Sequence, residues 1–175
     1  MGSDPLADAT RFEPIVRYKP GVRSSGYAFA FGLVFGLSAA QVGFVSYLFQ
    51  KFGNLEALYP TAPIKRALGA ALFAAIWSLL WVLGGYFVPM IPLIFAVFAS
   101  AGTYLGVAAV FASTIGSSCS STDAFQPPQF QDDCNVYTAI HALSWVLFGV
   151  CLILTGTLIY DAFIAKPKKK TVFGQ

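Results

Sequence analysis

Long uncharged stretches dominate the order of apolar and polar residues along the chain. Residues 24–50 and 134–160 each form a run of 27 residues without Asp, Glu, Lys or Arg, and residues 67–122 form a run of 56. Because about 20 apolar residues in a helix cross a bilayer core, the first and last runs each predict one membrane span, at about residues 27–48 and 136–158. A single helix over the middle run would be roughly 84 Å long, far more than a core of about 30 Å. The middle run must therefore fold back on itself.

Two prolines mark the point of reversal. Pro89 and Pro92 lie near the centre of the middle run, and proline lacks an amide hydrogen and restricts the residue before it. This predicts two spans, at about residues 67–87 and 91–112, joined by a very tight turn. Backbone groups in hydrocarbon must be satisfied within the protein, which leaves helices or a closed barrel, and the continuous apolar runs exclude the alternation of barrel strands. The predicted fold class is all-α, a bundle of four transmembrane helices.

The composition agrees with a membrane protein. Of the 175 residues, 57% are hydrophobic and only 11% are charged, whereas a soluble domain carries about a quarter charged residues. This excludes an ordinary soluble globule, a disordered chain and a nucleic-acid-binding module. A single domain is the natural prior at this length. We expect an N-terminal cytosolic tail at residues 1–25, a four-helix transmembrane domain at residues 26–163 and a basic cytosolic tail at residues 164–175.

Basic residues are distributed unequally over the two sides of the predicted bundle. An even number of spans puts both termini on one side, where eight Lys and Arg residues lie, against three in the two loops on the other side. The eight are Arg11, Arg17, Lys19, Arg23, Lys166, Lys168, Lys169 and Lys170, and the three are Lys51, Lys65 and Arg66. The positive-inside rule therefore predicts that both termini are cytosolic. The expected location is the plasma membrane or an endomembrane, in which the loops at residues 50–66 and 113–133 face the outside or an organelle lumen.

Two of the three cysteines flank the polar part of the last loop. Cys119 and Cys134 enclose residues 120–133 on the side predicted to be non-cytosolic, where disulfides persist. We predict a Cys119–Cys134 disulfide that holds two helix ends together, worth on the order of 3 kcal/mol in the chain-entropy model. The alternative is a pair of free cysteines near the interface. Cys151, in the fourth span, is expected to be a small core residue.

Pairs of glycines recur four residues apart within two predicted spans. Gly32 and Gly36 lie in the first span, and Gly102 and Gly106 lie in the third. This spacing lets helix backbones approach closely inside a membrane. The glycines either pack within the bundle or contact another subunit. Because the short tails and loops offer little of the roughly 1,000 Å² that a specific interface needs, we expect at least one pair to contact another chain.

Gln41 and His141 are polar residues inside predicted spans, and such residues are functional candidates by default. We expect His141 to be a neutral packing residue, with a proton relay or a ligand as the alternative. Asp161 closes the fourth span at the interface, near Lys166. The sequence shows no carboxylate pair, no nucleophile–base pair and no C-x-x-C, and its single histidine excludes the usual zinc sites and a bis-histidine haem held by this chain alone. We therefore predict no catalysis, no metal and no cofactor.

The layout resembles a MARVEL domain, and is most similar to the small fungal MARVEL-like membrane proteins. The resemblance runs from about residue 27 to residue 163: four helices with cytosolic ends, a very short second loop at residues 89–92 and a cysteine pair around the last non-cytosolic loop. Residues 133–145 are similar to that family's cysteine followed by small and aromatic residues at the start of the fourth helix, although His141 stands where an apolar or small residue is expected. The resemblance implies a non-catalytic scaffold that organises membrane domains, vesicle cargo or partner complexes, often in sterol-rich membrane.

Two functions are consistent with this sequence. The first is a non-enzymatic membrane-organising or trafficking protein, and the alternative is an accessory subunit of a larger membrane complex such as a pump, a synthase or an oxidase. Too few polar residues line any path for a transporter or channel, and an enzyme would rest only on His141 and Asp161. The expected partners are membrane lipids, sterol among them because 17 Phe and 8 Tyr residues suggest broad aromatic surfaces, and another membrane protein or a second copy. No nucleic-acid partner is expected.

Overall fold

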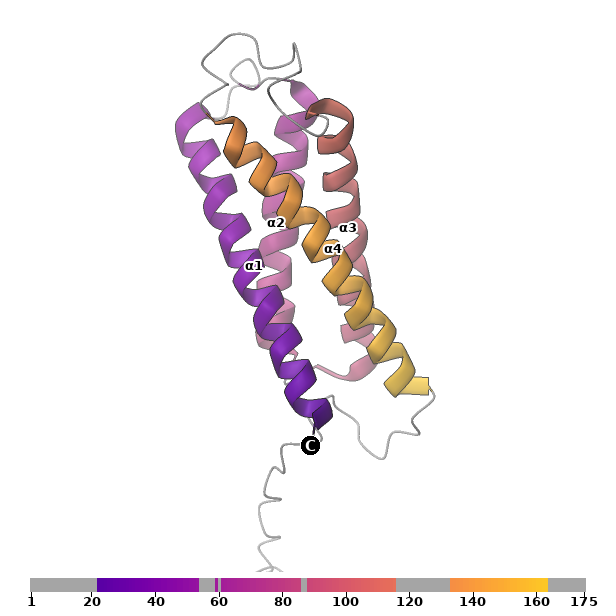
Figure 1. Ribbon diagram of the computed structural model, residues 1–175. Coiled ribbons are helices and arrows are strands. Elements are labelled where there is room, and N and C mark those ends of the chain that lie inside the picture. Colours follow the sequence, from indigo (N-terminus) through magenta and orange to yellow (C-terminus); the bar gives the residue numbers. More distant parts are fainter. Residues whose placement is uncertain (1–21, 54–58, 60, 86–87, 116–132, 164–175) are drawn as a thin grey trace, which may run out of the picture.

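Four long helices make up the part of the chain that the computed structural model describes, residues 22–53, 59, 61–85, 88–115 and 133–163 (Figure 1). All four are long and apolar enough to cross a membrane, and no strand occurs among the described residues. Their bounds are α1 Val22–Phe52, α2 Ala62–Gly84, α3 Met90–Ile115 and α4 Cys134–Phe163. The predicted all-α class with four spans is confirmed, and the chain is a multi-pass membrane protein.

The helices extend beyond the predicted spans at most ends. α1 begins at Val22, so the last residues of the predicted N-terminal tail belong to a helix. α2 begins five residues before the predicted span and includes Lys65 and Arg66, whose long side chains can reach the interface while their stems stay on apolar surface. Pro63 lies in the first turn of α2 after the extended Thr61, where the missing amide hydrogen of proline removes no helical hydrogen bond.

Glycine and proline define the ends of the helices near two turns. α1 stops at Phe52 because Gly53 adopts φ 66°, and its amide still donates to the carbonyl of Phe49 at 2.9 Å. A left-handed glycine directly after a helix is a common C-terminal cap. α2 ends at Gly84, earlier than predicted, and α3 begins at Met90 with Pro92 in its first turn. Pro89 therefore lies between α2 and α3, where the reversal was predicted, while Pro92 belongs to α3.

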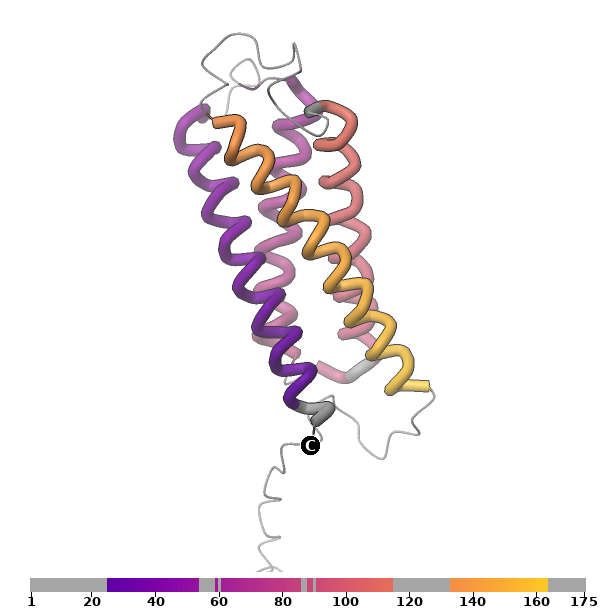
Figure 2. Tube along the Cα trace, viewed as in Figure 1, coloured from indigo at the N-terminus to yellow at the C-terminus, as the bar shows by residue number. Residues whose placement is uncertain are grey.

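The helices form an antiparallel bundle in which each packs against its neighbours in the order α1, α2, α3, α4, with α4 returning to α1. α1 and α3 thus occupy opposite corners. The beginning of α1 and the end of α4 lie at the same end of the bundle, which we call the terminal end, and the other is the loop end. Figure 2 shows α1 and α4 diverging as they approach the terminal end.

Two apolar clusters fill the interior. The loop-end cluster comprises Val45, Leu48, Phe52, Tyr59, Ile64, Ala67, Leu68, Ala71, Val107, Phe111, Tyr137 and Ile140. The terminal-end cluster comprises Tyr27, Phe31, Val34, Ala74, Trp81, Leu93, Val97, Ala101, Tyr104, Leu147, Cys151, Leu154 and Leu158. Cys151 is buried and free, as its core assignment requires.

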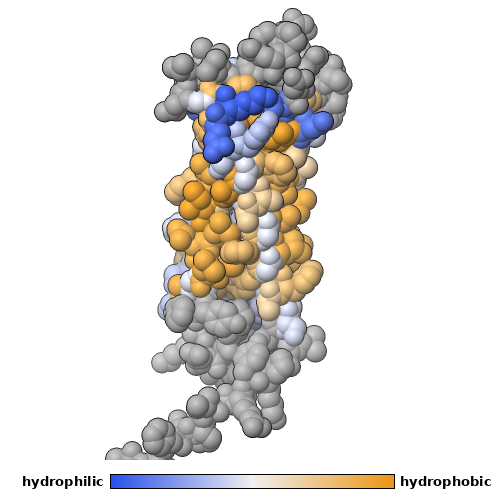
Figure 3. Space-filling view, turned by 90° about the vertical axis from the view of Figure 1, so that its left-hand side faces the viewer, coloured by the Kyte–Doolittle hydropathy of each residue, from blue (hydrophilic) through white to orange (hydrophobic). Residues whose placement is uncertain are grey.

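The outer surface is apolar as well. Large side chains such as Phe29, Phe95 and Ile153 are about 70% exposed, at 71%, 69% and 70%. Figure 3 shows this apolar band over the middle of the bundle, with hydrophilic side chains gathered at the loop end. A surface of this kind is normal where lipid replaces water as the solvent.

Candidate functional site

The four candidate glycines all lie on the outside of the bundle. Gly32 and Gly36 are exposed on α1, and Gly102 and Gly106 are exposed on α3. A Cβ atom built on any of them would meet nothing within 4 Å. The glycines therefore do not serve close packing inside this bundle, and their backbones are open to approach by another molecule.

Neighbouring small residues extend each glycine pair into a continuous outer face. On α1 the exposed residues Ala39, Ala40 and Gly43 continue the line of Gly32 and Gly36; we call these five residues the α1 small face. On α3 the exposed residues Ala99 and Ala109 flank Gly102 and Gly106; these four residues form the α3 small face. Because α1 and α3 occupy opposite corners, the two small faces point to opposite sides of the bundle.

A layer of buried polar side chains lies near the boundary of the two apolar clusters. The amide nitrogen Nε2 of Gln41 donates to Ser144 Oγ at 3.2 Å, which joins α1 to α4, and Ser144 donates to the carbonyl of Ile140 at 2.8 Å. Gln41 is 0% exposed. Its carbonyl oxygen has no hydrogen-bond partner among the described residues. Gln41 is thus placed in the centre of the bundle, where it links helices and reaches no outer surface.

Tyr104 is the second member of this layer. Its hydroxyl lies 3.3 Å from Ser38 Oγ and 3.0 Å from Ser78 Oγ, so that one side chain of α3 contacts both α1 and α2. The residue is 0% exposed. Hydrogen bonds between membrane helices contribute about 0.6 kcal/mol each on average. The sequence analysis named Gln41 and His141 but not Ser38, Ser78 or Tyr104. Polar side chains in the middle of a predicted span indicate hydrogen bonds between helices, and this indication applied to them as well.

His141 lies at the surface of α4 and is half-buried. Its Nε2 accepts a hydrogen bond from Trp145 Nε1 at 3.0 Å, and its ring stacks on Phe111, with centroids 6.3 Å apart and planes at 17°. Because the indole N–H can only donate, Nε2 carries no proton in this arrangement, and the imidazole is neutral with its proton on Nδ1. The contacts agree with the predicted packing role.

We expect His141→Gln to leave assembly and thermal stability unchanged, because the glutamine carbonyl can accept the Trp145 N–H in place of Nε2. His141→Leu, which offers no acceptor, should lower the free energy of unfolding by about 1 kcal/mol. Thermal unfolding in detergent and size-exclusion chromatography of both variants measure these effects. Loss of the native complex or of a proton-dependent activity in His141→Gln would refute the packing role.

An ion pair closes the loop end of the bundle. Lys51 Nζ lies 2.6 Å from Asp133 Oδ2, and Tyr47 donates to Asp133 Oδ1 at 3.4 Å. Asp133 is 3% exposed and precedes α4, while its backbone carbonyl accepts from the amide of Val136 at 2.9 Å. One basic charge on the side that the positive-inside rule disfavours is thus paired within the protein. The sequence did not predict this pair, whose members lie 82 residues apart.

Removing either member of this pair is expected to weaken the contact between α1 and the start of α4. Lys51→Met and Asp133→Asn should each lower the free energy of unfolding by about 1 kcal/mol or less, because Lys51 is 39% exposed and solvent screens its charge. The free energy of unfolding of the double variant should fall by less than the sum of the two single losses. Chemical denaturation of the four proteins gives this coupling, and strictly additive losses would show that the two charges do not interact.

The cysteines predicted to form a disulfide fall partly outside the described residues. Cys134 is the first residue of α4, and Cys119 lies outside the described residues. The Cys119–Cys134 disulfide therefore stays a prediction. Lys166, predicted to lie near Asp161, also falls outside the described residues, so this contact stays a prediction. Asp161 accepts a hydrogen bond from Tyr27 Oη at 2.7 Å.

The described residues contain no group of three or more His, Cys, Asp or Glu side chains that could hold a metal ion. No protein-family model, curated protein or solved structure matches this chain. What the protein does is inferred from its own geometry, in which the most distinctive surfaces are the two small faces.

Proposed function

We propose that this protein is a non-enzymatic integral membrane protein that organises membrane domains, trafficking or a partner complex through contacts between transmembrane helices. The exposure of all four glycines carries this proposal. In a membrane, lipid removes the hydrophobic drive for helix association, and close backbone approach at small residues takes its place. A bundle that leaves such residues outside has surfaces suited to a further helix.

The two small faces support more than one contact for each chain. Because they lie on opposite sides of the bundle, a helix bound at one face does not occupy the other. Self-association through both faces would link copies into arrays, which fits the MARVEL-like scaffold that the sequence resembles. A single larger partner at one face would instead make the protein an accessory subunit.

The proposal includes the orientation in which both termini are cytosolic. The beginning of α1 and the end of α4 share one end of the bundle, and eight basic residues flank that end in the sequence. The predicted Cys119–Cys134 disulfide then lies on the non-cytosolic side. This side is where oxidising conditions keep such bonds intact.

Single-cysteine variants should confirm this orientation. With the protein expressed at the plasma membrane, an impermeant maleimide added to intact cells is expected to label a cysteine placed in residues 120–132 and to leave one placed in residues 166–175 unlabelled until the membrane is permeabilised. These variants are made in a background without the three native cysteines. Labelling of the tail in intact cells would reverse the orientation.

The composition of the native assembly tests the proposed function. The protein is purified from its own membrane in mild detergent, and the components are identified by mass spectrometry and their stoichiometry is measured. A second copy or a set of trafficking proteins supports the scaffold, whereas a fixed ratio to one larger complex supports the accessory subunit. A monomer that carries only lipid would contradict both.

A further inference from the structure

A buried amide in the middle of the bundle has hydrogen-bonding capacity that the protein does not use. Gln41 is fully buried, and its Nε2 donates to Ser144 Oγ at 3.2 Å. Its carbonyl oxygen Oε1 has no hydrogen-bond partner among the described residues. A primary amide offers two N–H donors and a carbonyl with two lone pairs. A buried polar atom that no protein group satisfies is most often satisfied by an ordered water.

An unused donor lies in the same polar layer, one helical turn away. The hydroxyls of Ser38, Ser78 and Tyr104 are joined by two contacts, both to Tyr104 Oη. Each hydroxyl has one hydrogen and each contact uses one, so the third hydrogen has no acceptor among the described residues. When Ser78 donates to Tyr104 and Tyr104 donates to Ser38, the remaining hydrogen is that of Ser38. Ser38 and Gln41 are three residues apart on the buried side of α1, where such side chains are neighbours.

Small side chains lie at the level of Gln41 on two other helices. Since α2 runs antiparallel to α1, the residue one turn from Ser78 towards the loop end is Ala75. The residue one turn from Tyr104 in the same direction is Ala108. Both alanines are buried, yet neither belongs to an apolar cluster. The clusters therefore leave room beside Gln41, and a buried water needs only about 10–15 Å³ of free volume.

The chemistry of the site selects water. Gln41 offers an acceptor and a second N–H, Ser38 offers a donor, and a water molecule can accept and donate at the same time. A cation in the middle of a membrane needs a negative charge or many oxygen ligands to offset the loss of its hydration, but the five side chains of the polar layer carry no charge. They are Ser38, Gln41, Ser78, Tyr104 and Ser144. An apolar ligand would leave Oε1 unpaired.

We propose that the centre of the bundle binds one ordered water molecule, which donates to Gln41 Oε1 and accepts from Ser38 Oγ. The water completes a layer in which hydrogen bonds join all four helices. Gln41 connects α1 to Ser144 of α4, and Ser38 connects α1 to Tyr104 of α3, which also contacts Ser78 of α2. This site goes beyond the proposed function, because it lies in the interior and not on the small faces.

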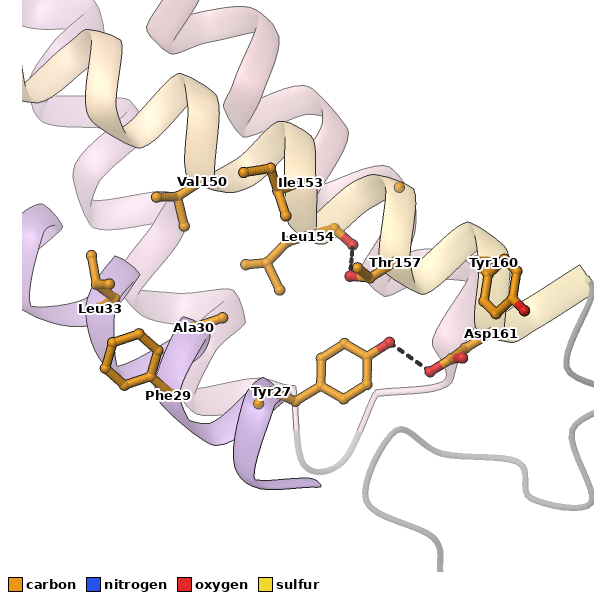
Figure 4. Close-up of a pocket in the computed structure, with 12 residues that line it drawn as sticks. Tyr27, Phe29, Ala30, Leu33, Val150, Ile153, Leu154, Thr157, Tyr160 and Asp161 are labelled. Atoms are coloured by element: carbon orange, nitrogen blue, oxygen red, sulfur yellow. Dashed lines mark hydrogen bonds between the residues drawn. The ribbon is translucent and has the colours of Figure 1, made fainter. Parts of the chain in front are cut away.

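The water lies where it supports the contact between α1 and α4. Towards the terminal end these helices diverge, and a groove of about 550 Å³ lies between residues 26–33 and 150–161 (Figure 4). Tyr27 donates to Asp161 at 2.7 Å across the mouth of this groove. Nearer the loop end, the hydrogen bond from Gln41 to Ser144 joins the same two helices. A water bound to Oε1 holds the amide in the orientation that this hydrogen bond needs.

A crystal structure of the full chain, grown in a lipid phase at a resolution that shows ordered water, tests the site. We expect a density peak at about 2.5–3.0 Å from both Gln41 Oε1 and Ser38 Oγ. The peak should be lost in Gln41→Met, whose side chain is similar in length but has no amide. Crystals soaked in rubidium chloride should show no anomalous peak there. A rubidium peak would replace the water by a monovalent cation, and Oε1 without a peak or in contact with a protein donor would overturn the site.

Unfolding in mixed micelles distinguishes a hydrated amide from a dry one. If the water is bound, Gln41→Met removes hydrogen bonds to the water and to Ser144, each worth about threefold, and the unfolding equilibrium constant should rise about tenfold. A dry amide would leave the constant unchanged or lower it, because methionine removes an unpaired buried group, and this result would overturn the site. Gln50→Met, at the exposed end of α1, is the matched control and should have no effect. If Gln41→Met does not fold, the density of the unmodified protein decides.

Discussion

Replacing Gly32 and Gly36 together by leucine, or Gly102 and Gly106 together, is expected to dissociate the native assembly in at least one of the two cases. Two leucine side chains on a small face keep a neighbouring helix from close approach, which should weaken association by about tenfold or more. The bundle itself should keep its stability to within about 0.5 kcal/mol. The reason is that the added side chains project into open space and meet no atom of this chain.

The measurement is the size of the assembly in mild detergent, read together with thermal unfolding. Gly69→Leu on α2 is the control, because Gly69 is also exposed but lies outside both small faces. An assembly that survives both double substitutions would place the interface elsewhere on the protein.

Tyr104→Ala is expected to be the most destabilising single substitution in the described part of the bundle interior. The side chain is among the largest of those that are fully buried, at 0% exposure. Its truncation leaves a cavity between the helices, and the loss of a large aromatic side chain from a core typically amounts to about 3–5 kcal/mol. Tyr104→Phe keeps the ring and removes only the hydroxyl contacts to Ser38 and Ser78, so it should lower the free energy of unfolding by about 1 kcal/mol.

Leu105→Ala is the matched control for Tyr104→Ala, because Leu105 is the next residue and is 40% exposed. Reversible unfolding in mixed micelles gives the three free energies. If Tyr104→Ala lost no more stability than Leu105→Ala, the buried position and the central role of Tyr104 would both be wrong.

The number and type of the helices could be predicted because charge is almost absent from the spans and because proline marks the reversal between the second and the third span, where no charged residue does. The ends were less predictable. Lys65 and Arg66 precede the uncharged run, yet both belong to the first turns of α2, because a long basic side chain at the end of a membrane helix can reach the interface. The end of α1, by contrast, depends on the left-handed conformation of Gly53.

The direction in which the candidate residues face could not be predicted. In a soluble helix an apolar stripe shows the buried side. Here the outer surface is apolar too, so the sequence did not show whether the glycine pairs face the interior of the bundle or its outer surface. Contacts between residues far apart in the sequence could not be predicted either. Tyr27 and Asp161 lie 134 residues apart, and nothing in the local sequence of either shows that α1 returns to α4.

Site-specific photocrosslinking tests the intramembrane contact most directly. A photoreactive phenylalanine analogue replaces Phe35, beside Gly36, or Leu105, beside Gly106, which are 42% and 40% exposed. Phe73 on α2, at 65% exposure, is the control position. We predict a crosslink to a second copy or to another membrane protein from position 35, position 105 or both, and lipid adducts alone from position 73. Lipid adducts alone from all three positions in the native membrane would contradict association through the small faces.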